Sequence, residues 1–293
     1  MTYSNKIIKA GVIGNPISHS LSPIIHNFYL EKYNIKGNYE KYLIAIDNYQ
    51  EQITNLINSQ QLSGFNVTIP FKEKIINLCD HLSSSARNIG AVNTIKIMEN
   101  GKIFGHNSDA FGFLNNLWRT LPNYNFQNTI NLIIGAGGAS RAILYALISQ
   151  KSKHIFIANR SKENADKLIH DFTIFAKQNQ TTMEFLSLQE ISNISPNLDL
   201  LVNTSSLGMK NQEPLNLDLR NFNPNCIIYD IVYNPLFTNL ILQAKKNNLK
   251  FVTGIGMLIY QALIGFELWF GKQPDYDQDL ENLLIKNLSL CNS

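Results

Sequence analysis

The sequence has little cysteine, and what it has is badly placed for cross-links. Cys79, Cys226 and Cys291 are the three cysteines among 293 residues. Cysteines that are far apart and odd in number fit neither a disulfide framework nor a zinc site with paired ligands. We therefore expect reduced thiols and no metal site.

Concentrated charge and an uninterrupted apolar run are also lacking. The formal net charge of +3 is spread over both halves, without the basic and aromatic clusters that nucleic-acid binding requires. Residues 254–271 approach the length of a membrane span, but Gln261 and Glu267 interrupt them, so we expect a buried helix. The apolar stretch near the N-terminus is too short for a signal peptide, which predicts a cytoplasmic protein.

The order of apolar patterns predicts two domains of α/β class. Up to about residue 110, strand-like runs alternate with helical patterns, as in βαβ units with a mostly parallel sheet. Residues 91–98 and 102–107 flank an Asn-Gly pair and predict a hairpin. A joint rich in Pro and Asn at 121–125 then leads into a second series of strands and helices. We place the first domain in 1–109 and the second in 110–256.

A glycine turn in the second domain predicts a dinucleotide site of the Rossmann type. The turn consists of Gly135, Ala136, Gly137, Gly138 and Ala139. A buried strand ends at its first glycine, the third residue lets the backbone approach a pyrophosphate, and the next helix begins with free N–H groups. Ser140 stands where glycine or alanine is usual. A purely structural glycine turn is the alternative.

The end of the following strand indicates which dinucleotide is bound. There the sequence has Asn159, Arg160, Ser161 and Lys162. NAD-binding proteins normally place a carboxylate at this point for the ribose hydroxyl, whereas the extra phosphate of NADP needs cations. The pattern favours NADP. The alternative is that Arg160 and Lys162 only begin a solvated helix.

Several polar residues of the first domain stand out. Ser18 and Ser20 lie two apart, so in an extended segment both hydroxyls would project to one side and could hold a carboxylate. Ser22 before Pro23 is typical of a helix N-cap. Lys72 falls at the start of a predicted helix, where the helix dipole disfavours a cation. That unfavourable position raises the question of its purpose.

Taken together, the motifs resemble those of the shikimate dehydrogenases over almost the whole chain. The matching stretches are GNPISHSLSP, GFNVTIPFK, IGAVNT, GHNSDAFG, GAGGASRA, ANRS, NTSSLGM, DIVYNP and GMLIYQA. The resemblance implies an N-terminal substrate domain, an NADP domain, and final helices in 257–293 that return to the first domain. It also implies a role for individual residues.

The implied roles are as follows. Ser18 and Ser20 would hold the substrate carboxylate. The ring hydroxyls of the substrate would be bound by Asn66, Thr68, Asn93 and Gln261. The catalytic pair would be Lys72 and Asp109. Tyr233 would line the cleft near the carboxylate, and Gly254 and Met257 would lie by the nicotinamide of NADP. Asp109 could instead simply cap a helix beginning at Ala110.

The implied chemistry explains the position of Lys72. Hydride transfer to a ketone leaves negative charge on oxygen, which a positioned ammonium stabilises and protonates. A nearby carboxylate, Asp109, would orient the ammonium and keep it charged. Either member of the pair could be the formal acid or base.

The implied function is reversible reduction of 3-dehydroshikimate to shikimate by NADPH in aromatic biosynthesis, by a monomer or homodimer. A quinate or dual quinate/shikimate dehydrogenase is the nearest alternative, and a non-catalytic NADP-binding regulator is a remote one. A metal-dependent dehydrogenase is excluded because no cysteine or histidine has ligand spacing. Many relatives carry a second arginine where Asn164 stands, and a threonine where Ser108 stands.

Overall fold

The computed structural model describes residues 7–290; Cys291 lies outside them. The chain forms two compact units. The first contains the residues up to Asp109 together with Leu258–Leu284, and the second contains Ala110–Met257 with the residues from Ile285 onward. The sequence had placed all of 257–293 with the first domain. Cys79 and Cys226 are free thiols, as expected.

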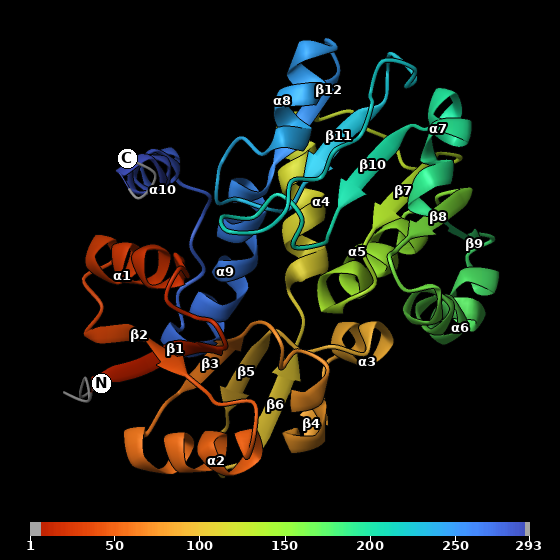
Figure 1. Ribbon diagram of the computed structural model, residues 1–293. Helices are drawn as coiled ribbons and strands as arrows, with labels where there is room; N and C mark the ends of the chain where they lie inside the picture. Colours follow the sequence, from red (N-terminus) through yellow and green to blue (C-terminus); the bar gives the residue numbers. More distant parts are fainter. Residues whose placement is uncertain (1–6, 291–293) are drawn as a thin grey trace. The chain divides into compact units, whose positions relative to one another are not determined.

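The first unit is built on a six-stranded sheet (Figure 1). Its strands are β1 (Ile8–Gly14), β2 (Gly37–Leu43), β3 (Gly64–Val67), β4 (His81–Leu82), β5 (Thr94–Ile97) and β6 (Ile103–His106), in the order β2-β1-β3-β5-β6-β4. β5 runs antiparallel to β3 and β6, while the other pairs are parallel. The predicted hairpin is confirmed, and Gly101 in its turn has φ of +79°.

Helices cover both faces of this sheet (Figure 1). They are α1 (Ser22–Lys32), α2 (Tyr49–Gln60), α3 (Ser84–Ile89) and most of α9 (Gly254–Phe270). On β3, Phe65 and Val67 pack with Ile53 of α2 in one apolar cluster. Gly64 points to the other face, where an added Cβ would lie 2.1 Å from the indole Nε1 of Trp269. Side chains alternate along a strand, so Asn66 also points to the face covered by α9.

The second unit has a fully parallel six-stranded sheet. Its strands are β7 (Ile130–Ile134), β8 (His154–Ala158), β9 (Thr182–Leu186), β10 (Leu200–Asn203), β11 (Ile227–Asp230) and β12 (Lys250–Thr253), in the order β12-β11-β10-β7-β8-β9. The order reverses at β7, as in a doubly wound Rossmann fold. The predicted fold class is therefore confirmed.

The helices of the second unit alternate with its strands, as the sequence predicts. They are α4 (Asp109–Thr120), α5 (Gly138–Ser149), α6 (Lys162–Gln178), the short α7 (Ile191–Ile194) and α8 (Asn239–Lys246). The first residue of α4, Asp109, belongs to the first unit, and α10 (Gln278–Leu290) begins in the first unit and ends in the second. The apolar segment from Gly254 is the single helix α9. Among the described residues, no helix is both long and apolar enough to cross a membrane.

His26 is a fully buried base in the core of the first unit. Its imidazole stacks on the ring of Tyr39 with centroids 4.1 Å apart and an interplanar angle of 14°. Neither ring nitrogen has a hydrogen-bond partner within residues 7–290. Burial lowers the pKa of His26 to about 3, because the low-dielectric interior disfavours the imidazolium. The folded protein therefore holds this ring neutral.

The folded state should lose stability as acid protonates His26 in the unfolded chain only. Below the unfolded pKa of about 6.5, this site should reduce the free energy of unfolding by about 1.4 kcal/mol per pH unit. The contribution of the neutral His26 to the free energy of unfolding is fully present above pH 6.5, and it is lost progressively as the pH falls toward 3. His26→Phe keeps an aromatic ring against Tyr39 but cannot titrate.

Urea unfolding of both proteins at several pH values between 4.5 and 7.5 measures the effect. We expect the stability of the wild type to fall relative to that of His26→Phe by about 2 kcal/mol between pH 7 and pH 5. Parallel curves for the two proteins would contradict a neutral buried His26.

Candidate functional site

The predicted substrate residues on the strands and loops of the first unit lie at one edge of its sheet, whereas Tyr233 belongs to the second unit. Ser18 and Ser20 follow β1, and Thr68 follows β3. β5 runs antiparallel, so its first residue, Thr94, pairs with Asn66 near the end of β3 and with His106 at the end of β6. The start of one strand thus meets the ends of three others, which brings their polar side chains together.

Lys72 does not begin a helix, contrary to the prediction. It lies in a turn before a short 3-10 helix, Lys74–Leu78. The backbone carbonyl of Lys72 accepts the N–H of Val92 at 2.7 Å, and Phe71 N–H donates to Thr68 O at 3.0 Å. The bond from Val92 holds this turn beside the segment that leads into β5, and the bond from Phe71 ties it to Thr68, which follows β3. Lys72 itself lies outside the 3-10 helix.

The Lys72 ammonium contacts the Asp109 carboxylate. Its Nζ lies 2.6 Å from Asp109 Oδ2, and the two side chains are 18% and 6% exposed. The second oxygen, Oδ1, accepts an N–H from Asn93 Nδ2 at 2.8 Å. Asp109 is the first residue of α4, and its own N–H donates to Asn107 Oδ1 at 3.0 Å. The carboxylate is thus engaged by Lys72 and Asn93, and Asn107 holds the backbone at the helix start.

Asn93 is the centre of a buried amide cluster. Besides Asp109, its Nδ2 lies 3.0 Å from Ser108 Oγ and 3.2 Å from Gln261 Oε1 of α9. Ser108 Oγ donates to the backbone carbonyl of Gln261 at 2.9 Å, and Gln261 Nε2 donates to Leu258 O at 3.1 Å. The second N–H of the Gln261 amide has no partner among residues 7–290 and is available to a ligand.

Asn66 and Thr68 differ in what they could offer a substrate. Asn66 is buried, and its Nδ2 donates to Asn93 O at 3.1 Å and Thr94 Oγ1 at 3.2 Å. Its Oδ1 accepts from the Tyr39 hydroxyl at 2.6 Å. Asn66 can therefore only accept one further hydrogen bond. Thr68 is partly exposed, and its hydroxyl has no bond to another described residue.

Ser18 and Ser20 lie in a turn rather than in an extended segment, which corrects the prediction. Ser20 N–H donates to Ile17 O at 3.1 Å and closes the turn. Ser20 Oγ donates to Ser22 Oγ at 3.2 Å. Lys41 Nζ of β2 donates to the carbonyl of Ser18 at 2.5 Å. The first residue of α1 is Ser22, its side chain caps no N–H, and the N-cap position is Leu21, so the predicted Ser22 cap is wrong.

The glycine turn of the second unit has one position that requires glycine and one that is open. Gly135 has φ of +117°, where a side chain would be strained, and an added Cβ would lie 2.7 Å from Thr204 Oγ1. Gly137 precedes α5, and an added Cβ there would meet nothing within 4 Å. The open side of Gly137 and the helix N-terminus behind it leave room for an anion. Ser140 Oγ accepts the Gly137 N–H at 3.1 Å, so this hydroxyl braces the turn.

The residues after β8 contain one free cation and one that is already paired. Lys162 Nζ lies 2.7 Å from Asp166 Oδ2, one turn further along α6, and 5.2 Å from the ring centroid of Phe185. Ser161 Oγ caps α6 by accepting the N–H of Asn164 at 3.3 Å. Arg160 is exposed, and its guanidinium has no partner in the part of the chain that the structure describes. The predicted pair of cations is therefore unequal.

The loop after β11 is held by a buried acid that sequence reasoning did not select. Asp230 accepts from Asn203 Nδ2, Val232 N–H and Thr238 Oγ1 at 2.9, 3.0 and 2.6 Å. Burial raises the pKa of Asp230 to about 6. This loop carries Tyr233, and burial raises the pKa of its phenol to about 12.

Gly254 and Met257, both predicted to lie by the nicotinamide, are in the first turn of α9. An added Cβ at Gly254 would lie 2.2 Å from the carbonyl oxygen of Ile231, so packing alone requires glycine there. Met257 is buried. A contact with a cofactor stays a prediction for both residues.

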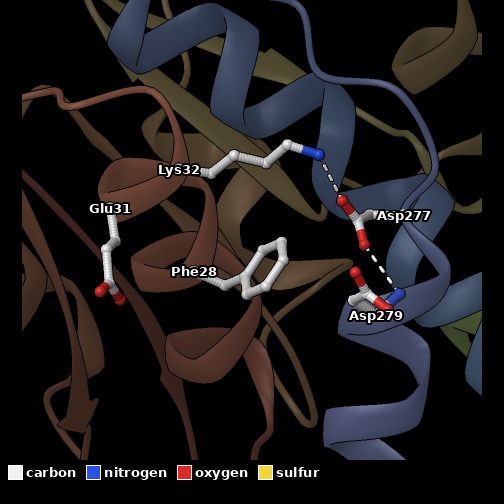
Figure 2. Close-up of a pocket in the computed structure, with 5 residues that line it drawn as sticks. All are labelled: Phe28, Glu31, Lys32, Asp277 and Asp279. Atoms are coloured by element: carbon white, nitrogen blue, oxygen red, sulfur yellow. Dashed lines mark hydrogen bonds and ion pairs between the residues drawn. The ribbon is translucent and has the colours of Figure 1, made fainter.

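A separate hollow of the first unit involves none of these residues. Figure 2 shows its lining, which is Phe28, Glu31, Lys32, Asp277 and Asp279. Lys32 of α1 donates to the Asp277 carboxylate, and this bond lowers the pKa of Asp277. Asp277 Oδ1 also accepts the Asp279 N–H at 2.8 Å. These contacts tie α1 to the start of α10, which is a structural role.

Three family models match the chain in the order of its domains. "Shikimate dehydrogenase substrate binding domain" matches residues 12–95, "Shikimate / quinate 5-dehydrogenase" matches 119–213, and "Shikimate 5'-dehydrogenase C-terminal domain" matches 254–284. The chain is 38% identical over 279 residues to a curated NADP(+) shikimate dehydrogenase of Jannaschia sp., covering 94% of this chain and 96% of the relative.

Solved structures agree with these matches. The shikimate dehydrogenase of Aquifex aeolicus superposes with a TM-score of 0.84 at 32% identity, covering 97% of this chain and 99% of that one. The Thermus thermophilus enzyme, solved with NADP(H) and shikimate, gives a TM-score of 0.80 at 31% identity, and the match covers 96% of this chain and 100% of that one.

Proposed function

Since the chain belongs to the shikimate dehydrogenase family, we propose that it catalyses the reversible reduction of 3-dehydroshikimate to shikimate by NADPH. The family assignment makes it an NADP-dependent oxidoreductase of the shikimate pathway. The observation that carries the specific proposal is the contact of Lys72 with Asp109, 2.6 Å apart beside Asn93. That pair lies on the two motifs from which the family's catalytic residues were inferred.

NADPH, when bound, would supply the hydride for the carbonyl carbon of the substrate. Lys72 donates a hydrogen bond to the carbonyl oxygen and then its proton, as negative charge grows there. Asp109 stabilises the ammonium form beforehand and orients its N–H groups. In the oxidative direction, the same two residues accept the hydroxyl proton, and either one can hold it.

The unused hydrogen-bonding groups of the first unit match a polyhydroxy acid. The hydroxyls of Ser18 and Thr68 and one N–H of Gln261 are available, and Asn66 can accept one more bond. Ser18 and Ser20 would hold the carboxylate, and the other residues the ring hydroxyls.

The second unit would bind NADP through its glycine turn and the cation after β8. The N–H groups at the start of α5 suit the pyrophosphate, and the open position at Gly137 lets it approach. Arg160 would bind the 2′-phosphate through charge-assisted bonds. Asn159, Ser161, Gly254 and Met257 would contact the rest of the cofactor.

A quinate or dual quinate/shikimate dehydrogenase is the second candidate, because one matching model names both substrates. Quinate has an extra hydroxyl on the carbon that bears the carboxylate. Serine at both Ser18 and Ser20 favours shikimate. A non-catalytic regulator is disfavoured, since a sensor has no use for a proton-transfer pair.

Initial rates with shikimate or quinate, each paired with NADP or NAD, would test the substrate and the cofactor together. We expect strong activity only with shikimate and NADP, followed by the absorbance of the reduced nicotinamide. Comparable kcat/KM with quinate would move the protein to the dual-specificity branch. No activity with any pair would favour the regulator.

Lys72→Met should lower kcat for shikimate oxidation by roughly a thousandfold, because it removes the proton-transfer group and keeps the length of the side chain. Lys74→Met is the matched control, since Lys74 is exposed and lies two residues away. Steady-state kinetics and thermal melts of both variants measure the effect. A well-folded Lys72→Met variant with wild-type kcat would contradict the catalytic role.

Arg160→Ala should raise the KM for NADP roughly 10- to 100-fold and leave the KM for NAD unchanged, because it removes charge-assisted bonds to the 2′-phosphate. Lys162→Ala should change the KM for NADP less than about threefold, since Lys162 is already paired with Asp166. Equal effects of the two variants would show that the ion pair opens to bind the cofactor.

Cytoplasmic location and a monomeric or homodimeric state stay predictions from the sequence. Light scattering of the purified protein measures the second.

A further inference from the structure

We propose that Thr94 is a positioning residue for the catalytic pair: through a directed chain of hydrogen bonds that begins at Tyr39, it fixes the amide of Asn93 with its N–H toward Asp109. The inference rests on the proposed function of Lys72 and Asp109. Neither Thr94 nor Tyr39 belongs to the residues inferred to touch the substrate or the cofactor.

The chain begins at the phenol of Tyr39. Its hydroxyl donates to Asn66 Oδ1 at 2.6 Å, and burial raises the pKa of Tyr39 well above its usual value. The phenol therefore keeps its proton and remains a donor. Stacking on His26 with centroids 4.1 Å apart fixes the ring of Tyr39. The oxygen of the Asn66 amide is thus held toward Tyr39.

The orientation of Asn66 determines that of the Thr94 hydroxyl. With its oxygen on Tyr39, Asn66 presents Nδ2 to Thr94 Oγ1 at 3.2 Å. A hydroxyl has a single proton to donate. Because Thr94 Oγ1 accepts from Asn66, its proton points to another acceptor, and Asn93 Oδ1 at 2.9 Å is nearer than Ser108 Oγ at 3.5 Å.

The last step sets the amide of Asn93. Its Oδ1 accepts from Thr94 Oγ1 and from Ser108 N–H, each at 2.9 Å. Two donors on the oxygen leave the nitrogen on the other side, where Nδ2 donates to Asp109 Oδ1 at 2.8 Å. The flipped amide would place a carbonyl oxygen against the carboxylate, which is repulsive. The correct amide leaves Asp109 Oδ2 for Lys72.

Burial gives the chain its strength. Tyr39, Asn66, Asn93, Thr94 and Asp109 are each between 0% and 4% exposed. Water therefore cannot easily replace a lost donor, and an unmatched polar atom in such a place is costly. All five side chains lie in the first unit, so the chain is complete without the second.

Thr94→Val tests the inference, because valine has the shape of threonine without the hydroxyl. We expect a kcat for shikimate oxidation reduced roughly 10- to 100-fold, with KM changed less than about threefold. Thr94→Ser should recover most of the activity.

Tyr39→Phe acts two hydrogen bonds further away and should give a smaller loss of kcat, again with little change in KM. Tyr39→Phe also tests the inference if Thr94→Val does not fold. A purely structural role for Thr94 would lower the melting temperature and leave kcat of the folded variant unchanged, and equal losses in Thr94→Val and Thr94→Ser would show that packing matters instead. Either result would overturn the inference.

A readout independent of turnover separates this inference from the proposed function. In ¹⁵N-labelled protein, the Asn93 side-chain amide signals, assigned by their loss in Asn93→Ser, should shift in Thr94→Val and return in Thr94→Ser. Wild-type protein without activity on shikimate would refute the proposed function alone, whereas unshifted Asn93 signals in Thr94→Val would refute the positioning role alone.

Discussion

The contact between the Lys72 ammonium and the Asp109 carboxylate is the interaction on which the polar interior of the first unit depends. Removing either charge would leave the other largely buried and unpaired, which is strongly destabilising. The fold therefore anchors both backbones. Val92 N–H binds the carbonyl of Lys72, and Asn107 Oδ1 accepts the N–H of Asp109. The two charges meet because their main chains are fixed first.

The topology of the sheet explains why so many polar side chains share one edge. A parallel sheet alone would bring together only residues that follow strands. Because β5 is antiparallel to both neighbours, the residues at its start, Asn93 and Thr94, join those that follow β1, β3 and β6. The single change of direction thus supplies the amide and the hydroxyl that surround the carboxylate.

Sequence patterns predicted the units and the motifs better than the local geometry of the site. The glycine turn, α6 and α9 follow from patterns that depend on a few neighbouring residues. The sequence pattern predicts a helix at Lys72, because apolar residues continue at helical spacing through Lys74–Leu78. In the structure that segment is only a short 3-10 helix, and it begins after Lys72. Ser18 and Ser20 were treated as extended, whereas the bond from Ser20 N–H to Ile17 O makes a turn.

Partnerships between distant residues were beyond the reach of sequence patterns. The pairing of Lys162 with Asp166 is the exception, because the two lie four residues apart on α6 and helical spacing alone could have indicated it. Thr94 and Asn107 lie within the motifs that carry the family resemblance, but their roles depend on atoms from other strands. The direction of an amide is fixed by what its two ends meet, and those partners come from the tertiary structure.

The neutral chain from Tyr39 to Asn93 also explains how a carboxylate can be oriented in a buried place without further charge. Another cation near Asp109 would have to be desolvated, and it would compete with Lys72 for the same oxygens. Amides and hydroxyls add no net charge, yet each fixes the direction of the next. With one carboxylate oxygen occupied by Asn93 and the other by Lys72, the ammonium has a single preferred position. The precision of the pair thus comes from uncharged groups that never need to touch the substrate.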